Sequence, residues 1–83
     1  MAKSDVSLHL RSYGDEGKHH SHGHHQLVLP LLGKLSLFVD QTEGAVERNR
    51  AAIIPSGSDH GYSASDQNRF LVADVPEILA PAL

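Results

Sequence analysis

Alternation of apolar and polar residues is the feature that most limits what this chain can fold into. In VSLHLRSY, Val6, Leu8 and Leu10 fall on one face of an extended strand, and the polar residues between them fall on the other. Short apolar segments bounded by turn residues follow, namely QLVLPLLG at 26–33, LSLFVD at 35–40, AAIIP at 51–55, YSAS at 62–65 and RFLVADV at 69–75. No segment shows a sustained helical period, and AVERNR at 45–50 is ambiguous. The pattern predicts an all-β protein of about six or seven short, mostly antiparallel strands in a sandwich or barrel.

The length of the chain limits how much core it can bury. Its 83 residues predict a single domain over 1–83. Domains of this size bury only ~60% of their unfolded surface and often gain stability from disulfides, a metal or oligomerisation. The absence of cysteine excludes disulfides and thiolate metal sites. Because QLVLPLLG is more apolar than one face of a small barrel can bury, we expect a homodimer that uses this strand or the N-terminal strand.

Charge and hydropathy exclude two classes of partner. The net charge is −3 with neutral histidines, and the seven lysines and arginines are scattered along the chain. Nucleic-acid binding needs a concentrated positive patch, so we expect no direct nucleic-acid binding by this chain alone. No apolar run approaches the ~20 residues of a membrane helix. MAKSDVSLHL at the N-terminus lacks the apolar core of a signal peptide, and we therefore expect a cytoplasmic protein without membrane contact.

A histidine tract is the strongest chemical signal. Five histidines lie between His19 and His25. Such a tract can be a solvated loop that binds metal adventitiously. However, His20 and His22 form an H-x-H pair, and residues i and i+2 of an extended chain point the same way, about 6–7 Å apart. Two such imidazoles can reach one ion, and His60, after the turn PSGSD, is the candidate for a third ligand from a facing wall.

Even-numbered and odd-numbered residues of an extended tract point to opposite faces, and this parity predicts which neighbours of His20 and His22 lie in the same site. His24 and Gln26 continue the even-numbered face, so His24 is a candidate pocket residue. His19 and His25 should then face solvent or a partner chain. Tyr62 lies two residues after His60 and either lines the pocket or packs in the core. On the last predicted strand, we expect the charged residues Arg69 and Asp74 at the surface.

The first half of this pattern resembles a motif of the cupin superfamily. In that motif H-x-H is followed by a glutamate after three residues and by a glycine after six more. Here His20 and His22 supply the histidines, Gln26 stands at the glutamate position and Gly33 matches the glycine.

The second cupin motif is also present in part. Pro55, Gly57 and His60 match its P-x-G and histidine in register, while Asn49 and Ala64 replace its glycine and asparagine. Together the two motifs span about half the chain. The resemblance implies a small cupin-type β-barrel, or jelly roll, whose interior holds a metal or a small molecule.

A metal site would use His20, His22, Gln26 and His60 on this resemblance, with Zn, Ni, Fe or Mn as candidates. A neutral amide binds a divalent ion more weakly than a carboxylate does, which disfavours Fe(II) or Mn(II) and favours ions that suit imidazole. An alternative is that His24 or His25 replaces the missing carboxylate. The other alternative is a metal-free pocket in which these side chains hydrogen-bond an organic ligand.

One branch of the superfamily is especially similar. HHQLVLPLLGKLSLFVD followed by AAIIPSGSDHGYSASDQNRFLVADVP resembles the N-terminal cupin domain of AraC-type transcriptional regulators. Those domains sense a small molecule and often dimerise, and a separate helix-turn-helix domain binds DNA. The resemblance implies the sensory half of a regulator, with 1–83 a fragment that lacks the DNA-binding part. The alternatives are a stand-alone metal-dependent cupin enzyme, of dioxygenase or isomerase type, and a structural dimerisation module.

Overall fold

The fold is all-β, as the sequence predicts. The computed structural model describes residues 5–14, 19–64 and 66–80. Within them the strands are β1 (Ser7–Arg11), β2 (His19–His20), β3 (His24–Leu32), β4 (Lys34–Val39), β5 (Thr42–Glu47), β6 (Ala52–Ile54), β7 (His60–Ser63) and β8 (Arg69–Pro76), followed by the 3-10 helix η1 (Glu77–Leu79). The eight described strands exceed the predicted six or seven, and β2 and β5 are the ones that no predicted segment covers. β2 is only two residues long, and β5 is an edge strand with a single buried side chain, so neither carries a clear alternating pattern.

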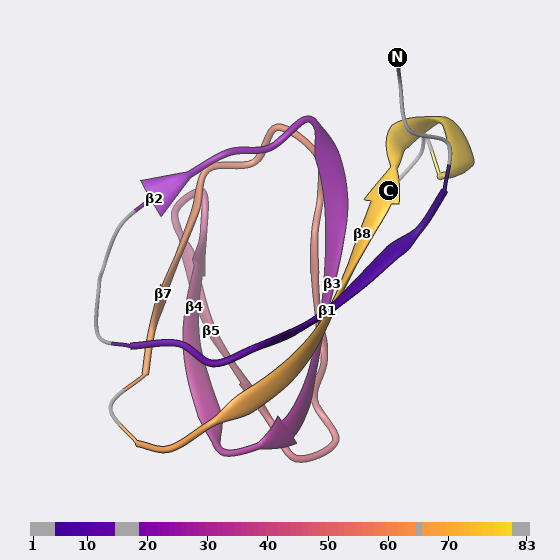
Figure 1. Ribbon diagram of the computed structural model, residues 1–83. Coiled ribbons are helices and arrows are strands. Elements are labelled where there is room, and N and C mark those ends of the chain that lie inside the picture. The colour runs from indigo at the N-terminus through magenta and orange to yellow at the C-terminus, as the bar shows by residue number, and fades with distance from the viewer. Residues whose placement is uncertain (1–4, 15–18, 65, 81–83) are drawn as a thin grey trace.

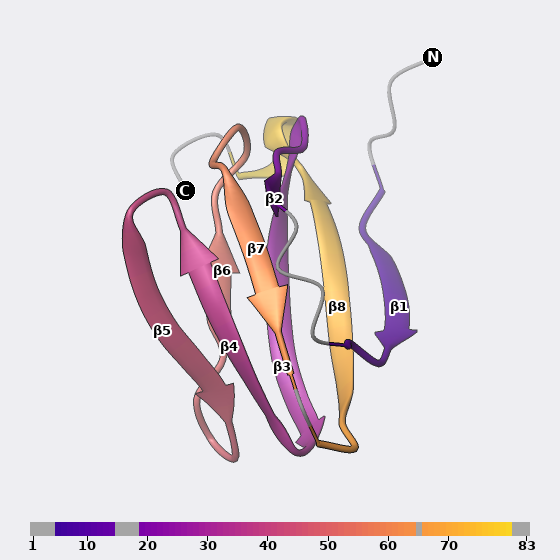
Figure 2. The same ribbon diagram turned by 90° about the vertical axis from the view of Figure 1, so that its left-hand side faces the viewer.

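Two antiparallel sheets face each other. The first has the strand order β1-β8-β3-β6 and the second β2-β7-β4-β5. Figure 1 shows the space between the sheets from the side, and Figure 2 shows the second sheet in front of the first. In the described part of the chain, no helix has the length and apolar character needed to cross a membrane.

The inner faces of the sheets change from apolar to polar along the strands. Phe70 and Val72 of β8 are buried in the core, and Asp74 continues the same face. On β3, Val28 is fully buried and Gln26 lies two residues nearer the start of the strand. The core cluster therefore fills one half of the interior, with the side chains of Val28, Leu35, Leu37, Val46, Ile54, Ala64, Phe70 and Val72. The other half is left for polar side chains.

The end of β3 explains how the chain passes between the sheets. The β3–β8 register shifts between Pro30 and Leu32, because a proline cannot donate a backbone hydrogen bond to the ladder. Gly33 follows with φ +82°, and a Cβ there would lie 2.6 Å from the carbonyl oxygen of Gln67. Only glycine fits this turn without strain.

The outer face of the first sheet is apolar and exposed. Leu29 of β3 pairs with Leu71 of β8, which pairs with Leu10 of β1. Cross-strand partners share a face, so these side chains form a continuous row. Leu10 is 61% exposed, Leu29 39% and Ile53 of β6 51%. Contiguous apolar surface of this kind usually marks an interaction site.

This face is where the sequence-based prediction of a homodimer can be tested. Leu29→Glu places a charge in the middle of the row, and burying that charge against a second copy would be strongly unfavourable. We expect light scattering at micromolar concentration to give a dimer for the unchanged chain and a monomer for Leu29→Glu. Gln41→Glu, in the exposed turn between β4 and β5, is the matched control and should stay dimeric. A monomeric unchanged chain would contradict the prediction.

Candidate functional site

A cavity occupies the polar half of the barrel interior. Its volume is about 610 Å³. Its wall combines residues of β1, β3, β7 and β8 with the segments next to β1 and β3, and consists of Leu10, Arg11, Ser12, Tyr13, His22, His24, Gln26, Tyr62 and Asp74. Three predicted pocket or ligand residues, His22, His24 and Gln26, thus line the same cavity as Tyr62 of the facing sheet.

Three imidazoles meet at one end of this cavity. The ring of His22 lies 5.1 Å from the ring of His24 and 5.0 Å from that of His60, measured between centroids. His60 is almost fully buried, and its Nδ1 lies 3.1 Å from the carbonyl oxygen of Ser58. The PSG turn holds the tract in place, because the backbone N–H of Gly57 donates to the carbonyl oxygen of His22 at 2.8 Å.

A carboxylate that we expected at the surface lies inside. Asp74 pairs in register with Gln26, and the Nε2 of Gln26 donates to its Oδ1 at 2.9 Å. The Nε2 of His24 lies 3.4 Å from the same oxygen, and the Nε2 of His9 lies 3.1 Å from Oδ2. The prediction of a surface position was wrong. Asp74 has the parity of Phe70 and Val72, and that signal was available in the sequence.

Gln26 links this carboxylate to a pair of tyrosines. The hydroxyl of Tyr62 donates to Oε1 of Gln26 at 3.2 Å. The hydroxyl of Tyr13 hydrogen-bonds to that of Tyr62, and the two rings stack with centroids 4.5 Å apart. Burial raises the pKa of both phenols above the ordinary value of 10.0, so both remain neutral at physiological pH. Tyr62 takes both of its predicted positions, because it lines the cavity and packs against the core cluster.

Tyr13 owes its position to Asn68, a residue that the sequence did not single out. The backbone N–H of Tyr13 donates to Oδ1 of Asn68, and Nδ2 of Asn68 donates to the carbonyl oxygen of Tyr13, both at 2.8 Å. Asn68 is itself buried. An asparagine in a DQN turn looks like ordinary turn chemistry, so nothing in the sequence pointed to this long-range clamp.

His25 was predicted to face solvent or a partner chain, but its own chain buries it. It has the expected odd parity and points to the outer side of the sheet, but it is only 3% exposed. Its Nδ1 accepts a hydrogen bond from the backbone N–H of Ser56 at 2.8 Å. Ser56 in turn donates through its hydroxyl to the carboxylate of Glu77 in η1. The PSG turn and η1 therefore cover this end of the sheet, and His25 lies outside the cavity.

The predicted metal site includes His20, whose side chain lies outside the described part of the structure. The backbone of His20 pairs directly with that of His60, whereas the side chains of His19 and His20 are not among those described. The described side chains include no group of three His, Cys, Asp or Glu arranged to hold an ion. Both polar ends of the Gln26 amide are already hydrogen-bonded. The described residues alone therefore do not fit a metal centre.

Solved structures with the same architecture identify the fold. An RmlC-like cupin from Shewanella frigidimarina superposes with a TM-score of 0.77 at 17% identity, over 90% of this chain and 69% of its own. A cupin-2 domain containing protein from the same organism gives 0.75 at 16% identity, over 88% and 72%. The Clostridium difficile EutQ protein gives 0.75 at 17% identity, over 86% and 56%. The chain has the cupin fold.

The likeness is one of fold alone. No protein-family model matches this cupin-fold chain, and no curated protein matches its sequence. At these identities a shared barrel implies no shared ligand or activity. The similarity to AraC-type regulators therefore remains a prediction.

The stacked tyrosines give this cupin barrel a testable response to alkali. The unfolded chain loses its phenol protons at lower pH than the folded chain does. The contribution of the two tyrosines to the stability of the fold is therefore fully present below about pH 10 and falls as pH rises further. We expect tyrosinate absorbance to appear together with unfolding, and Tyr13→Phe to reduce the pH dependence of stability. The chain has only two tyrosines and no tryptophan, so the signal is clean. Titration of both phenols near pH 10 in the folded state would contradict this.

Proposed function

We propose that this chain is a binding domain for a small polar organic molecule, held in the cavity between the two sheets. The observation that supports it best is the cavity itself. Its 610 Å³ lies within the range of about 300–1,000 Å³ that is usual for ligand pockets. Polar groups from β1, β3, β7 and β8 converge on it, rather than the apolar side chains that would fill a solid core.

The wall is organised in advance of any ligand. Gln26 is held from both sides by Tyr62 and Asp74, and Asn68 holds the backbone at Tyr13. A ligand would not have to order these side chains on binding, which lowers the entropic cost of association. Pre-formed polar walls of this kind favour recognition of one ligand orientation.

The finer part of the proposal is a sensory role like that of AraC-type regulators. β1 supports it, because Arg11 of this strand lines the cavity and Leu8 is exposed on the other side. A ligand that orders β1 would change the surface offered to a second copy. A sensor should show a dimer dissociation constant that changes when ligand is added, and sequencing beyond codon 83 should find two helix-turn-helix motifs.

A metabolite screen by thermal denaturation tests the binding proposal. A ligand at 100 times its Kd should stabilise the folded chain by about 2.7 kcal/mol. His22→Ala removes a cavity side chain and should weaken binding at least ~10-fold, about 1.4 kcal/mol. Gln41→Ala, in an exposed turn, should bind as the unchanged chain does. Equal affinity of His22→Ala would show that the ligand binds elsewhere.

A metal site is the second candidate, and it supports the alternative of a stand-alone cupin enzyme. The rings of His22 and His60 are 5.0 Å apart, and the backbone of His20 is paired with that of His60. These three histidines would hold the ion, which would act as a Lewis acid or bind substrate. Imidazole suits Zn or Ni.

Metal-dependent stability tests this candidate directly. Zn or Ni should raise the melting temperature of the unchanged chain, and the effect should fade as pH drops through ~6.5, because protons compete for imidazole. The change of His20, His22 and His60 together to alanine should abolish it. If the effect survives, the ion binds to other histidines and this site is wrong.

A further inference from the structure

We propose that the ligand of this cavity carries a single carboxylate group and that Arg11 binds it. This inference rests on the proposed function, since it names the chemical class of the molecule that occupies the cavity. It is based on Arg11, a charged residue of the cavity wall that has no ion-pair partner within the described chain.

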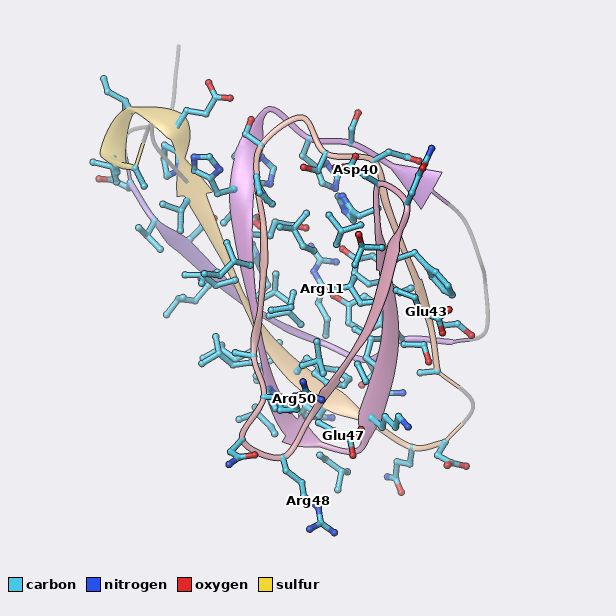
Figure 3. The ribbon with its side chains drawn as sticks, turned by 180° about the vertical axis from the view of Figure 1, so that it is seen from behind. Arg11, Asp40, Glu43, Glu47, Arg48 and Arg50 are labelled. Atoms are coloured by element: carbon cyan, nitrogen blue, oxygen red, sulfur yellow. The ribbon has the colours of Figure 1, made fainter. Side chains whose placement is uncertain are left out.

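Arg11 points into the barrel interior. It pairs in register with Phe70, whose side chain is fully buried in the core, and cross-strand partners share a face. In Figure 3 the Arg11 side chain lies between the ribbons of the two sheets. It lines the cavity and remains exposed, so a ligand can reach it.

No group in the described chain neutralises this guanidinium. Among the described residues, Arg11 has no hydrogen bond and no ion pair. The carboxylate of Asp74, which lines the same cavity, accepts a hydrogen bond from Gln26 and lies 3.1 Å from His9 and 3.4 Å from His24, but it makes no ion pair with Arg11. An arginine that lines a cavity and has unused donors can form charge-assisted hydrogen bonds with an anion there.

The two tyrosines do not supply that anion. Tyr13 donates to Tyr62, and Tyr62 donates to Gln26, so both hydroxyl protons are engaged. Burial keeps the pKa of each phenol above its usual range, and neither becomes a phenolate at neutral pH. The stacked rings instead offer an apolar surface beside Arg11 on which the body of an organic acid can pack.

The charge of the cavity favours a carboxylate over a phosphate ester. A guanidinium binds either group through two parallel hydrogen bonds, so hydrogen-bond geometry does not separate them. Asp74 contributes negative charge to the same cavity, which penalises a dianion more than a monoanion. The inferred ligand class is therefore a monocarboxylic acid with a neutral polar or aromatic body.

Two probes of the same shape separate this inference from the proposed function. We would titrate the labelled chain with benzoate and with benzamide and follow backbone amide shifts by NMR. The inference expects saturable shifts at cavity residues and at least ~10-fold tighter binding of benzoate, and weaker binding of phenyl phosphate. Binding of benzamide in the cavity with no preference for benzoate would overturn the inference and leave the proposed function standing. Absence of cavity shifts with all three probes would overturn both.

Variants then assign the effect to one residue. Arg11→Gln keeps a long polar side chain without the charge and should abolish the preference for benzoate over benzamide. Arg69→Gln is the matched control, because Arg69 is an exposed arginine on the neighbouring strand β8, one position before Phe70, and has the opposite parity. Its preference for benzoate should be unchanged. A preference that survives in Arg11→Gln, or is lost equally in Arg69→Gln, would contradict a specific role for Arg11.

Discussion

The register between β3 and β8 is the constraint on which the rest of the structure depends. It sets Val28 opposite Val72 and Gln26 opposite Asp74. One register therefore builds both the apolar half of the interior and the polar half. A slip by one residue would turn Gln26 and Asp74 outward and put Leu27 in their place. Because the outer face of this sheet is also apolar, the hydrophobic pattern alone resists such a slip less than usual, and the polar contacts help to specify the register.

The polar half is stable because its groups satisfy one another. Each hydrogen bond contributes only about 0.5–1.5 kcal/mol net, but an unsatisfied buried partner costs more than that. The network from Tyr13 through Tyr62 and Gln26 to Asp74 removes this cost for four side chains at once. The remaining space is a cavity whose shape and hydrogen-bond donors are set by the fold rather than by a ligand.

β1 connects the two surfaces on which the proposed function rests. It is an edge strand, hydrogen-bonded within its sheet only to β8. Its inner side carries His9, beside Asp74, and Arg11, while its outer side carries exposed leucines. A strand held on one side is easier to displace than a central strand. Occupation of the cavity and association of the outer face would thus act on the same five residues.

The sequence by itself determined the all-β class, because alternation of apolar and polar residues acts locally. It also indicated the meeting of His22 with His60, because the spacing of the two motifs put these histidines on facing walls. Only the tertiary structure decided the rest. The partners of the Asp74 carboxylate were set because β8 pairs with β3, and His25 was covered because η1 and the PSG turn fold over it. Asn68 reaches Tyr13 across 55 positions of sequence. Such contacts depend on which strands become neighbours, and residue patterns along a chain do not encode that pairing locally.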